Sequence, residues 1–587
     1  MASSSYQKIN STSKPNHLFV AAIDFGTTYS GYAFSSTADW EKVHTNIWRG
    51  NKLVSPKAPT VVLLNPNQSF NSFGYNAEKA YGELVEEQPE DPGKPTYKDY
   101  YYFQNFKMKL HNTKNVTEGT IIEDIRGKPM QALIIFAYAI RELKNNLMEQ
   151  LQKAFTDAKE NDVLYVLTVP AIWDERAKLF MRKAAKKAGI DEEMLLIALE
   201  PEAASVFCQT LPFHIEDVGQ KQLVKPGTQY MVADLGGGTA DLTVHKRTEN
   251  GKLRELWRAS GGPWGGKNVN ENFLQCITNI VTPKAMEKLR KTEMDDYLDL
   301  LEEIESKKKN VNVQKKSLTI TVPLSVSECT SDETNYKTLE DAVAASTYSS
   351  SITVKKNKLT FMKNVLNELF EPIVEEIIKK MKDVFSHIES EIPYILLVGG
   401  FSECEIVREK IREQFPSKTI IAPLESGLIV LRGAVYYGHL PEPISVRCAP
   451  YTYGIQSWPP FDPLLHPRNK RVLINGEERC KDVFFKFVTI GDAIEPGCTK
   501  SQNFQILDTK QTSLECIVYI SEEEDPEFVD TCTPLLKLSI PLKDFRGRGI
   551  VEIEESLIFG ETELRIKARD HWSGMEYVVS KELATRI

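Results

Sequence analysis

The 587-residue sequence predicts an α/β protein with two related lobes around a shared cleft, followed by a β-rich C-terminal domain. A repeated turn predicts the lobes: AAIDFGTTYSGYAF superposes on VADLGGGTADLTVH so that Asp24 lies on Asp234 and Gly26 on Gly236. Each turn joins two apolar stretches, which indicates an internal duplication. A change of texture after Leu440 predicts the third part, because short alternating runs recur there between turn signals.

Each segment follows from these observations. Residues 1–16 are rich in Ser, Asn and Lys and predict a disordered tail. Residues 17–440 form the two-lobed domain, with lobes at 17–210 and 225–440. Residues 445–587 alternate apolar and polar positions, which predicts a β-sandwich-like domain without a helical lid.

Composition restricts the function classes. The chain is 41% hydrophobic and 26% charged, an ordinary soluble balance, and its net charge of −9 argues against a nucleic-acid partner. Its nine cysteines are scattered and form no C-x-x-C pair, which argues against structural zinc and disulfides and favours a reducing compartment. The longest apolar run, Ala132–Ile140, is too short to span a bilayer. We therefore expect a cytoplasmic protein without membrane insertion.

The second turn, DLGGGTAD, allows two interpretations. Taken alone it favours a tight β-hairpin between Met231–Leu235 and Ala240–Val244, because glycine tolerates positive φ. Its repetition favours a ligand site instead. Glycine-rich turns expose backbone N–H groups and let phosphate oxygens approach the chain closely.

Carboxylates adjoin both turns. Asp24, Asp234 and Asp241 are hard oxygen donors that suit Mg²⁺, so two facing turns would hold a nucleoside triphosphate and its metal. A further pair, Gly399 and Gly400, follows an apolar strand. This pair would place backbone against a base or ribose, although a plain strand-to-helix turn explains it equally well.

Two other stretches carry candidate charges. Glu200 stands at the end of an apolar strand, immediately before a predicted helix. In EEIESKKKN, Glu303 precedes Lys307 and Glu305 precedes Lys309 by four residues. That spacing favours a solvated, salt-bridged helix, so it assigns these lysines no ligand by itself.

Six stretches, in order and spacing, resemble the nucleotide-binding domain of the seventy-kilodalton heat-shock chaperones, within the actin-like (ribonuclease H-like) ATPase superfamily. They are IDFGTTYSGYAFS, TVPAIWDERAKLFMRKAAKKAG, LEPEAAS, DLGGGTADLTV, GGKNVNENF and LLVGGFSECEIVREKIREQF. The resemblance covers about residues 18–440. FKMKL and LEPEAAS are similar to the divergent subgroup called heat shock seventy-kilodalton protein twelve.

The resemblance implies roles for individual residues. The phosphates would be bound by Gly26, Thr27, Thr28, Tyr29, Gly236, Gly237, Gly238 and Thr239, with Gly265 and Gly266 beside them. Asp24 and Asp234 would hold Mg²⁺ through water. The catalytic residues would be Lys107, Glu200, Asp234, Thr239 and Asp241. The nucleoside would be lined by Lys308, Lys309, Gly399 and Gly400.

Several positions depart from the family pattern. Lys309 stands where ordinary members have an arginine beside adenine, and lysine lacks arginine's planar stacking surface. Phe401 replaces the usual serine after the paired glycines, and Glu202 replaces a threonine. The leucine-rich interdomain linker is not recognisable in GHLPEPISVRCAPYTYGI.

These features together predict an atypical chaperone-like ATPase that binds ATP or ADP with Mg²⁺ and hydrolyses ATP. Its C-terminal domain would bind unfolded polypeptide or a specific client protein, with co-chaperones as further partners. Two alternatives remain open: a nucleotide-sensing scaffold with little turnover, and a small-molecule kinase of the same superfamily. A kinase would need a polyol pocket and a carboxylate base aimed at a substrate hydroxyl.

Overall fold

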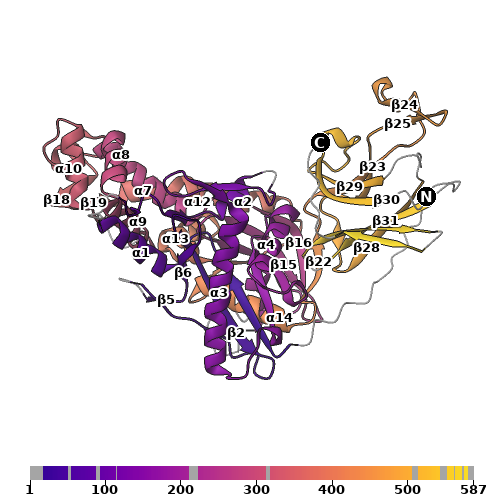
Figure 1. The fold of residues 1–587 in the computed structure, drawn as a ribbon, viewed down its shortest axis with the longest axis horizontal. Helices are drawn as coiled ribbons and strands as arrows, with labels where there is room; N and C mark the ends of the chain where they lie inside the picture. Colours follow the sequence, from indigo (N-terminus) through magenta and orange to yellow (C-terminus); the bar gives the residue numbers. More distant parts are fainter. Residues whose placement is uncertain are drawn as a thin grey trace.

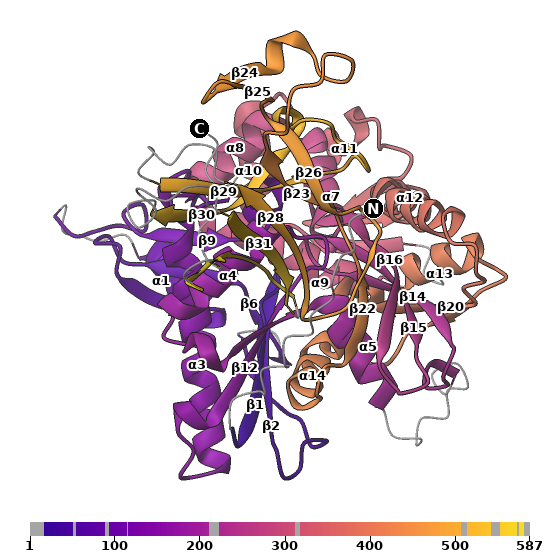
Figure 2. The ribbon, with the colours of Figure 1, turned by 90° about the vertical axis from the view of Figure 1, so that its right-hand side faces the viewer.

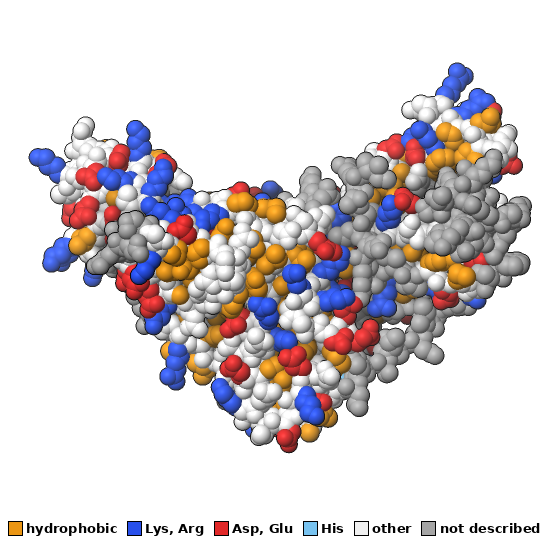
Figure 3. All heavy atoms as spheres, viewed as in Figure 1, with side chains coloured by type: hydrophobic (Ala, Val, Ile, Leu, Met, Phe, Trp, Pro, Cys, Tyr) orange, Lys and Arg blue, Asp and Glu red, His pale blue; other side chains and the backbone are white. Residues whose placement is uncertain are grey.

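The computed structural model describes residues 17–50, 54–87, 93–113, 116–210, 222–311, 317–505, 513–541, 552–560, 562–571 and 574–579. The tail expected over residues 1–16 lies outside them. The described chain forms a large α/β body and a group of strands at its C-terminal end (Figure 1). Figure 3 shows the same view as a V, with a helix-rich arm on one side and the C-terminal strands on the other.

The first lobe is built on a six-stranded sheet. Its strands are β1 (Phe19–Asp24), β2 (Tyr29–Ser36), β3 (His44–Thr45), β6 (Ala58–Pro59), β12 (Val163–Val169) and β13 (Leu195–Leu199). β1 pairs antiparallel with β2 and parallel with β12, which pairs parallel with β13. All residues of β1 and β12 are buried, as expected for strands covered by helices on both faces.

The second lobe repeats this pairing. Its seven-stranded sheet runs β21 (Thr419–Ile421), β20 (Tyr394–Val398), β14 (Gln229–Leu235), β15 (Ala240–Arg247), β16 (Leu253–Gly262), β22 (Ile444–Cys448) and β27 (Ala493–Ile494). β14 pairs antiparallel with β15 and parallel with β20, as β1 does with β2 and β12. The predicted hairpin and the predicted duplication are therefore confirmed.

Smaller elements complete the first lobe. They are β4 (Trp48–Arg49), β5 (Val54–Ser55), β7 (Val61–Leu64), β8 (Phe70–Phe73), α1 (Tyr75–Glu86), β9 (Tyr101–Gln104), α2 (Met108–Asn112), β10 (Ile121–Glu123), β11 (Pro129–Gln131), α3 (Ala132–Ala154), α4 (Glu175–Lys187) and α5 (Glu200–Thr210). Asp174 caps α4 by accepting a hydrogen bond from the Ala177 N–H (N···O 2.9 Å).

Helices dominate the rest of the second lobe. They are α7 (Gly266–Val281), α8 (Pro283–Thr292), α9 (Met294–Lys309), α10 (Leu324–Glu333), α11 (Leu339–Ala345), α12 (Lys363–Ser386), α13 (Glu405–Gln414) and α14 (Ser426–His439). A small sheet of β17 (Ser317–Thr321), β19 (Lys358–Met362) and β18 (Ile352–Lys355) accompanies them. None of the helices in the described ranges combines the length and apolar composition needed to cross a membrane.

Two helices join the lobes. α5 and α14 pack together, and their core includes Val20 and Val166 from the first sheet and Val232 from the second. A Cβ atom on Gly433 would collide with the backbone carbonyl of Ala203, so glycine is required where the helices cross. Figure 2 shows β1, β2 and β12 on one side and β14, β15 and β20 on the other.

The C-terminal strands form two four-stranded sheets around one apolar core. The first sheet holds β26 (Val483–Val488), β23 (Thr452–Ser457), β29 (Ser513–Ser521) and β30 (Thr533–Pro541). The second holds β28 (Cys498–Gln505), β31 (Glu552–Phe559), β32 (Leu564–Asp570) and β33 (Glu576–Val579). A hairpin of β24 (Arg471–Ile474) and β25 (Glu477–Cys480) projects from them (Figure 2). Among the described residues beyond His439 there is no α-helix.

The segment that joins the two parts is itself a strand. β22 pairs in parallel with β16, so residues that showed no recognisable linker pattern extend the sheet of the second lobe. All nine cysteines, which include Cys448 in β22, are free thiols.

Candidate active site

The two glycine turns meet between the lobes. The first is fixed by Gly26, whose N–H donates to Ser30 Oγ (3.1 Å) and whose carbonyl accepts from Thr60 Oγ1 (2.9 Å). In the second turn the Gly236 N–H donates to the Thr239 carbonyl (2.9 Å). Each turn is therefore held by hydrogen bonds within its own lobe.

The glycines of the second turn allow it to approach the first turn closely. None of Gly236, Gly237 and Gly238 has a positive φ, so the expectation that this hairpin needs left-handed residues is wrong. Instead, a Cβ atom on Gly237 would collide with the side chain of Thr28, and one on Gly238 would collide with that of Thr27. The turns of the two lobes are in contact only because these positions lack side chains.

A third glycine segment holds the second turn from the side. The Gly266 N–H donates to the Gly236 carbonyl (3.1 Å), and the Lys267 N–H donates to the Gly237 carbonyl (2.8 Å). A Cβ atom on Gly265 would collide with the Gly237 backbone. The structure thus brings Gly265 and Gly266 to the turn, as the resemblance implies.

Four carboxylates and two lysines gather beside these turns. They are Asp24, Glu200, Asp234, Asp241, Lys57 and Lys107. Lys107 Nζ lies 2.8 Å from Glu200 Oε1, and Lys57 Nζ lies 2.6 Å from Asp24 Oδ2. The Asp241 carboxylate accepts the Ile172 N–H (3.0 Å).

Burial sets the protonation of these groups. Burial, then Glu200, Asp241 and Asp24, raise the pKa of Asp234 well above its ordinary range. Burial also raises the pKa of Glu200 to about 7, although Lys107 opposes the shift. Burial would raise the pKa of Asp24 as well, but Lys57, Lys107 and Thr168 together outweigh it and the pKa is lowered. Carboxylates thus outnumber lysines in the cluster, and the raised pKa values mean that it favours uptake of positive charge, which a proton or a divalent cation would supply.

The nucleoside candidates are placed differently from one another. Lys308 is buried and donates to the Gly266 carbonyl (3.0 Å) and to Glu305 Oε2 (2.6 Å), so it anchors the start of α7. Lys309 Nζ lies 3.2 Å from Glu305 Oε1 and 3.9 Å from the centre of the Tyr29 ring, across the interlobe gap. These two lysines lower the pKa of Glu305 to about 2, against the effect of burial.

The surroundings of Gly399 and Gly400 also differ. Gly399 has a φ of +82°, and a Cβ atom there would collide with Asp234. Gly400 faces open space. Phe401 is buried in the core of the second lobe, 3.1 Å from where a Cβ of Gly266 would lie.

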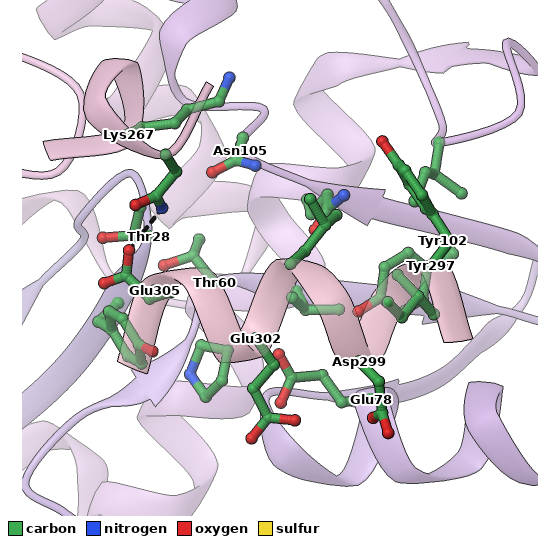
Figure 4. Close-up of a pocket in the computed structure, with 18 of the residues that line it drawn as sticks. Thr28, Thr60, Glu78, Tyr102, Asn105, Lys267, Tyr297, Asp299, Glu302 and Glu305 are labelled. Carbon is green, nitrogen blue, oxygen red and sulfur yellow. Dashed lines mark hydrogen bonds between the residues drawn. The ribbon is translucent and has the colours of Figure 1, made fainter. Parts of the chain in front are cut away.

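A cavity of about 1140 Å³ begins at the first turn and runs between α1 and α9. Figure 4 shows Thr28 and Glu305 at one end, Tyr102 at the other, and Glu78 and Glu302 along α1 and α9. Burial and Glu302 raise the pKa of Glu78 to about 8. Within the described chain, the lining of this cavity includes neither the second glycine turn nor the buried carboxylate cluster.

Comparisons with known proteins decide the family. The family model described as Hsp70 protein matches residues 96–447. Heat shock 70 kDa protein 12A of Mus musculus is 32% identical over 94% of this chain and 90% of its own length. Heat shock 70 kDa protein 12B of Homo sapiens is 32% identical over 94% of this chain and 89% of its own length. The chain belongs to the Hsp70 family.

A more distant Hsp70 relative matches a shorter part. Chaperone protein DnaK of Thermoplasma acidophilum is 24% identical over 55% of this chain and 46% of its own length. The predicted subgroup and the predicted actin-like ATPase fold class are thus confirmed. Family membership supports a nucleotide-binding Hsp70-like protein.

In this Hsp70 chain the C-terminal part contacts the ATPase-like body through partly buried ion pairs. Arg447 of β22 binds Glu202 with two hydrogen bonds of 2.6 and 2.8 Å. Arg182 of α4 binds Glu563 in the same bidentate way, at 2.7 and 2.6 Å. Glu202, noted above as a departure from the family pattern, therefore contacts the connecting strand.

Sequence reasoning missed two members of the site. Lys57 lies in SPKAPT, which carries no glycine turn or other motif, and it reaches Asp24 from 33 residues away. Glu305 was assigned only to a helical salt bridge, yet it binds both Lys308 and Lys309. Glu305 stands three and four residues before Lys308 and Lys309, to which the resemblance assigns the nucleoside, and that spacing could have marked it. No local signal marks Lys57.

Proposed function

We propose that this chain is an atypical Hsp70-type ATPase that hydrolyses ATP between its lobes and couples hydrolysis to its C-terminal β-domain. The observation that carries the proposal is the buried Lys107–Glu200 pair, which lies with Asp234 and Asp241 beside two touching glycine turns. A surface lysine would have no reason to be buried beside a carboxylate cluster.

The backbone N–H groups of the two turns would bind the phosphates, with Thr27, Thr28 and Thr239 as hydroxyl donors. Because Thr28 and Gly237 are in contact, the lobes must part for phosphates to enter. Asp24 and Asp234 would hold Mg²⁺ through water. When bound, Mg²⁺ would neutralise phosphate charge.

Glu200 would act as the base. A carboxylate whose pKa is about 7 can accept a proton near neutral pH. Water would attack the γ-phosphorus, the bond to the β–γ bridging oxygen would break, and the water proton would pass to Glu200. Lys107 would stabilise the charge that develops on the transferred phosphoryl group, and Asp241 and Thr239 would orient the attacking water.

The β-domain would bind an extended polypeptide or one client protein. Backbone pairing at an open strand edge would hold the peptide, and release would be fast because the described chain beyond His439 has no α-helix to serve as a lid. Co-chaperones would act on the same cycle.

Single-turnover hydrolysis tests the proposal. Lys107→Ala should keep ATP bound and lose about 100-fold or more in rate, the usual cost of removing a transition-state donor. Lys109→Ala is the matched control, because Lys109 lines the acidic cavity and no ion pair within the described chain involves it. Equal rates for the parent and Lys107→Ala would refute the assignment.

A nucleotide-sensing scaffold with little turnover is the second candidate. The contact between the turns and the engagement of Lys309 by Tyr29 favour it, because both oppose nucleotide entry. Tight ATP binding without hydrolysis, in the presence or absence of unfolded peptide, would select this alternative.

A further inference from the structure

Lys57 is an additional cation at the candidate site. It lies between β5 and β6, outside both glycine turns, and its Nζ is 2.6 Å from Asp24 Oδ2. The side chains of Lys57 and Asp24 are only 17% and 7% exposed. This pair is therefore part of the interior and is weakly screened by solvent.

The surrounding backbone is shaped to admit the lysine. Asp24 faces Gly31 in the β1–β2 register. A Cβ atom on Gly31 would lie 2.8 Å from Lys57 Cγ, so the absence of a side chain there lets the lysine stem cross β2. Pairing of Ala58 with Ser30 holds the base of the stem. Lys57 thus reaches Asp24 along a defined path.

The two lysines, Lys57 and Lys107, are paired with only two of the four carboxylates. Both oxygens of Asp24 already have a protein partner, because Oδ1 accepts from Thr168 Oγ1 (2.9 Å) and Oδ2 accepts from Lys57 Nζ (2.6 Å). Glu200 is paired with Lys107. Within the described residues, Asp234 and Asp241 have no lysine or arginine within ion-pair distance.

The Lys57 ammonium has donors to spare. A lysine ammonium carries three N–H donors, and in the described chain only one is bonded, to Asp24. The other two are available to phosphate oxygens that enter beside the first turn. An ammonium held in place by a buried carboxylate loses little side-chain freedom when it binds them.

We propose that Lys57 is a built-in cation of the phosphate site, which supplies part of the charge otherwise provided by Mg²⁺ and so permits nucleotide binding without the metal. This inference rests on the proposed nucleotide site and goes beyond it. It predicts that nucleoside di- and triphosphates bind measurably in the presence of a chelator.

Equilibrium titration of the full chain with a fluorescent ADP, in EDTA and in excess Mg²⁺, tests this. The parent should bind in both media. Lys57→Met should lose about 10- to 100-fold in affinity in EDTA, as expected for a charge-assisted hydrogen bond, and less than about threefold in Mg²⁺. Lys57→Arg should recover most of the loss, because it keeps the charge.

Two further variants control for folding and for charge. Lys291→Met removes an exposed lysine, paired with Glu287 at 2.6 Å, and should leave affinity unchanged in both media. Lys57→Met combined with Asp24→Asn avoids an unpaired buried carboxylate. If Lys57→Met alone does not fold, this double variant should show the same loss in EDTA.

The outcomes separate the two proposals. Binding by the parent only in Mg²⁺, or an equal loss by Lys57→Met in both media, overturns the role of Lys57 and leaves the nucleotide site intact. Absence of binding by the parent in both media overturns the proposed nucleotide site itself, and this inference with it.

Discussion

The two glycine turns are copies of one design, yet their aspartates lie in opposite electrostatic surroundings. Asp24 of the first turn is bound by Lys57 and Thr168, and its pKa is lowered. Asp234 of the second turn has three acidic neighbours, and its pKa is raised well above the ordinary range. Strand register places the two residues equivalently, each opposite the strand that follows its turn.

The difference teaches that duplication conserves position but not chemistry. The repeated strands place both carboxylates, whereas residues from outside the repeat decide which one stays ionised. Lys57 comes from a connection that has no counterpart in the second lobe among the described residues. The cluster therefore accepts positive charge on the Asp234 side.

The largest expected effect is a difference in the free energy of unfolding between variants of the two aspartates. Asp24→Asn leaves Lys57 without its buried partner and should lower the free energy of unfolding by up to about 3–5 kcal/mol. Asp234→Asn removes a buried carboxylate that forms no ion pair within the described residues, and should leave stability in the absence of nucleotide unchanged or raised. Denaturant unfolding of both variants measures the contrast, and equal losses would contradict it.

The contact between the turns gives the next effect. Gly237→Val places methyl groups against Thr28 and should reduce nucleotide affinity by about 10- to 100-fold, the usual range for overpacking. Gly119→Ala is the control, because Gly119 lies outside the candidate site and a Cβ atom there meets only Thr117 Oγ1, at an ordinary 3.8 Å. Calorimetric titration with ATP compares the two. Unchanged affinity in Gly237→Val would mean that the phosphates bind elsewhere.

The pH dependence of stability also distinguishes the carboxylates, here Glu200 and Asp24. The pKa of Glu200 rises from 4.5 to about 7 in the folded chain, so the native state holds this proton more tightly than the unfolded chain. Its contribution to stability is present below pH 4.5 and is lost as the pH rises to about 7. Asp24 acts oppositely, because its lowered pKa stabilises the fold above pH 3.8 and fails below it.

The melting temperature of the parent, relative to that of Glu200→Gln, should therefore fall between pH 5 and pH 7. A difference that is constant across this range would show that Glu200 is already ionised at pH 5. Lys107 is present in both proteins, so the difference in their melting temperatures reports on Glu200.

The smallest effect concerns the cation–π contact between Tyr29 and Lys309. An exposed cation–π contact contributes about 0.5–1 kcal/mol, so Lys309→Ala should weaken closure of the lobes only slightly. GTP should compete with ATP almost as well in the variant as in the parent, because lysine offers no planar surface for a base. Strong adenine selectivity that survives Lys309→Ala would place the base-discriminating contact elsewhere.

Local pattern predicted what is locally determined. The apolar strands around each turn, the Asp174 cap and the helix that begins at Glu200 follow from short stretches of sequence, and the structure has all three. The glycines were predicted to provide positive φ in a hairpin or to admit phosphate oxygens. None of the three has a positive φ, and contact with the opposite turn is what excludes side chains at Gly237 and Gly238. That contact exists only once both lobes are assembled.

The missed features depend on long-range contacts. Lys57 reaches Asp24 over 33 residues, and β22 becomes a strand because Ile444 pairs with Leu253 of the second lobe. No periodicity in SVRCAPYTYGI marks that pairing. Position and motif could predict the two turns, but charge balance and linker structure needed the assembled fold.

One turn of helix α5 imposes a constraint on sequence change. Glu200 and Glu202 are two residues apart, roughly 200° around the helix axis, so one faces Lys107 and the other faces Arg447. Loss of either Glu202 or Arg447 alone would leave a buried charge without its counter-charge. The two positions should therefore covary. Relatives with an uncharged residue at one position should also have an uncharged residue at the other.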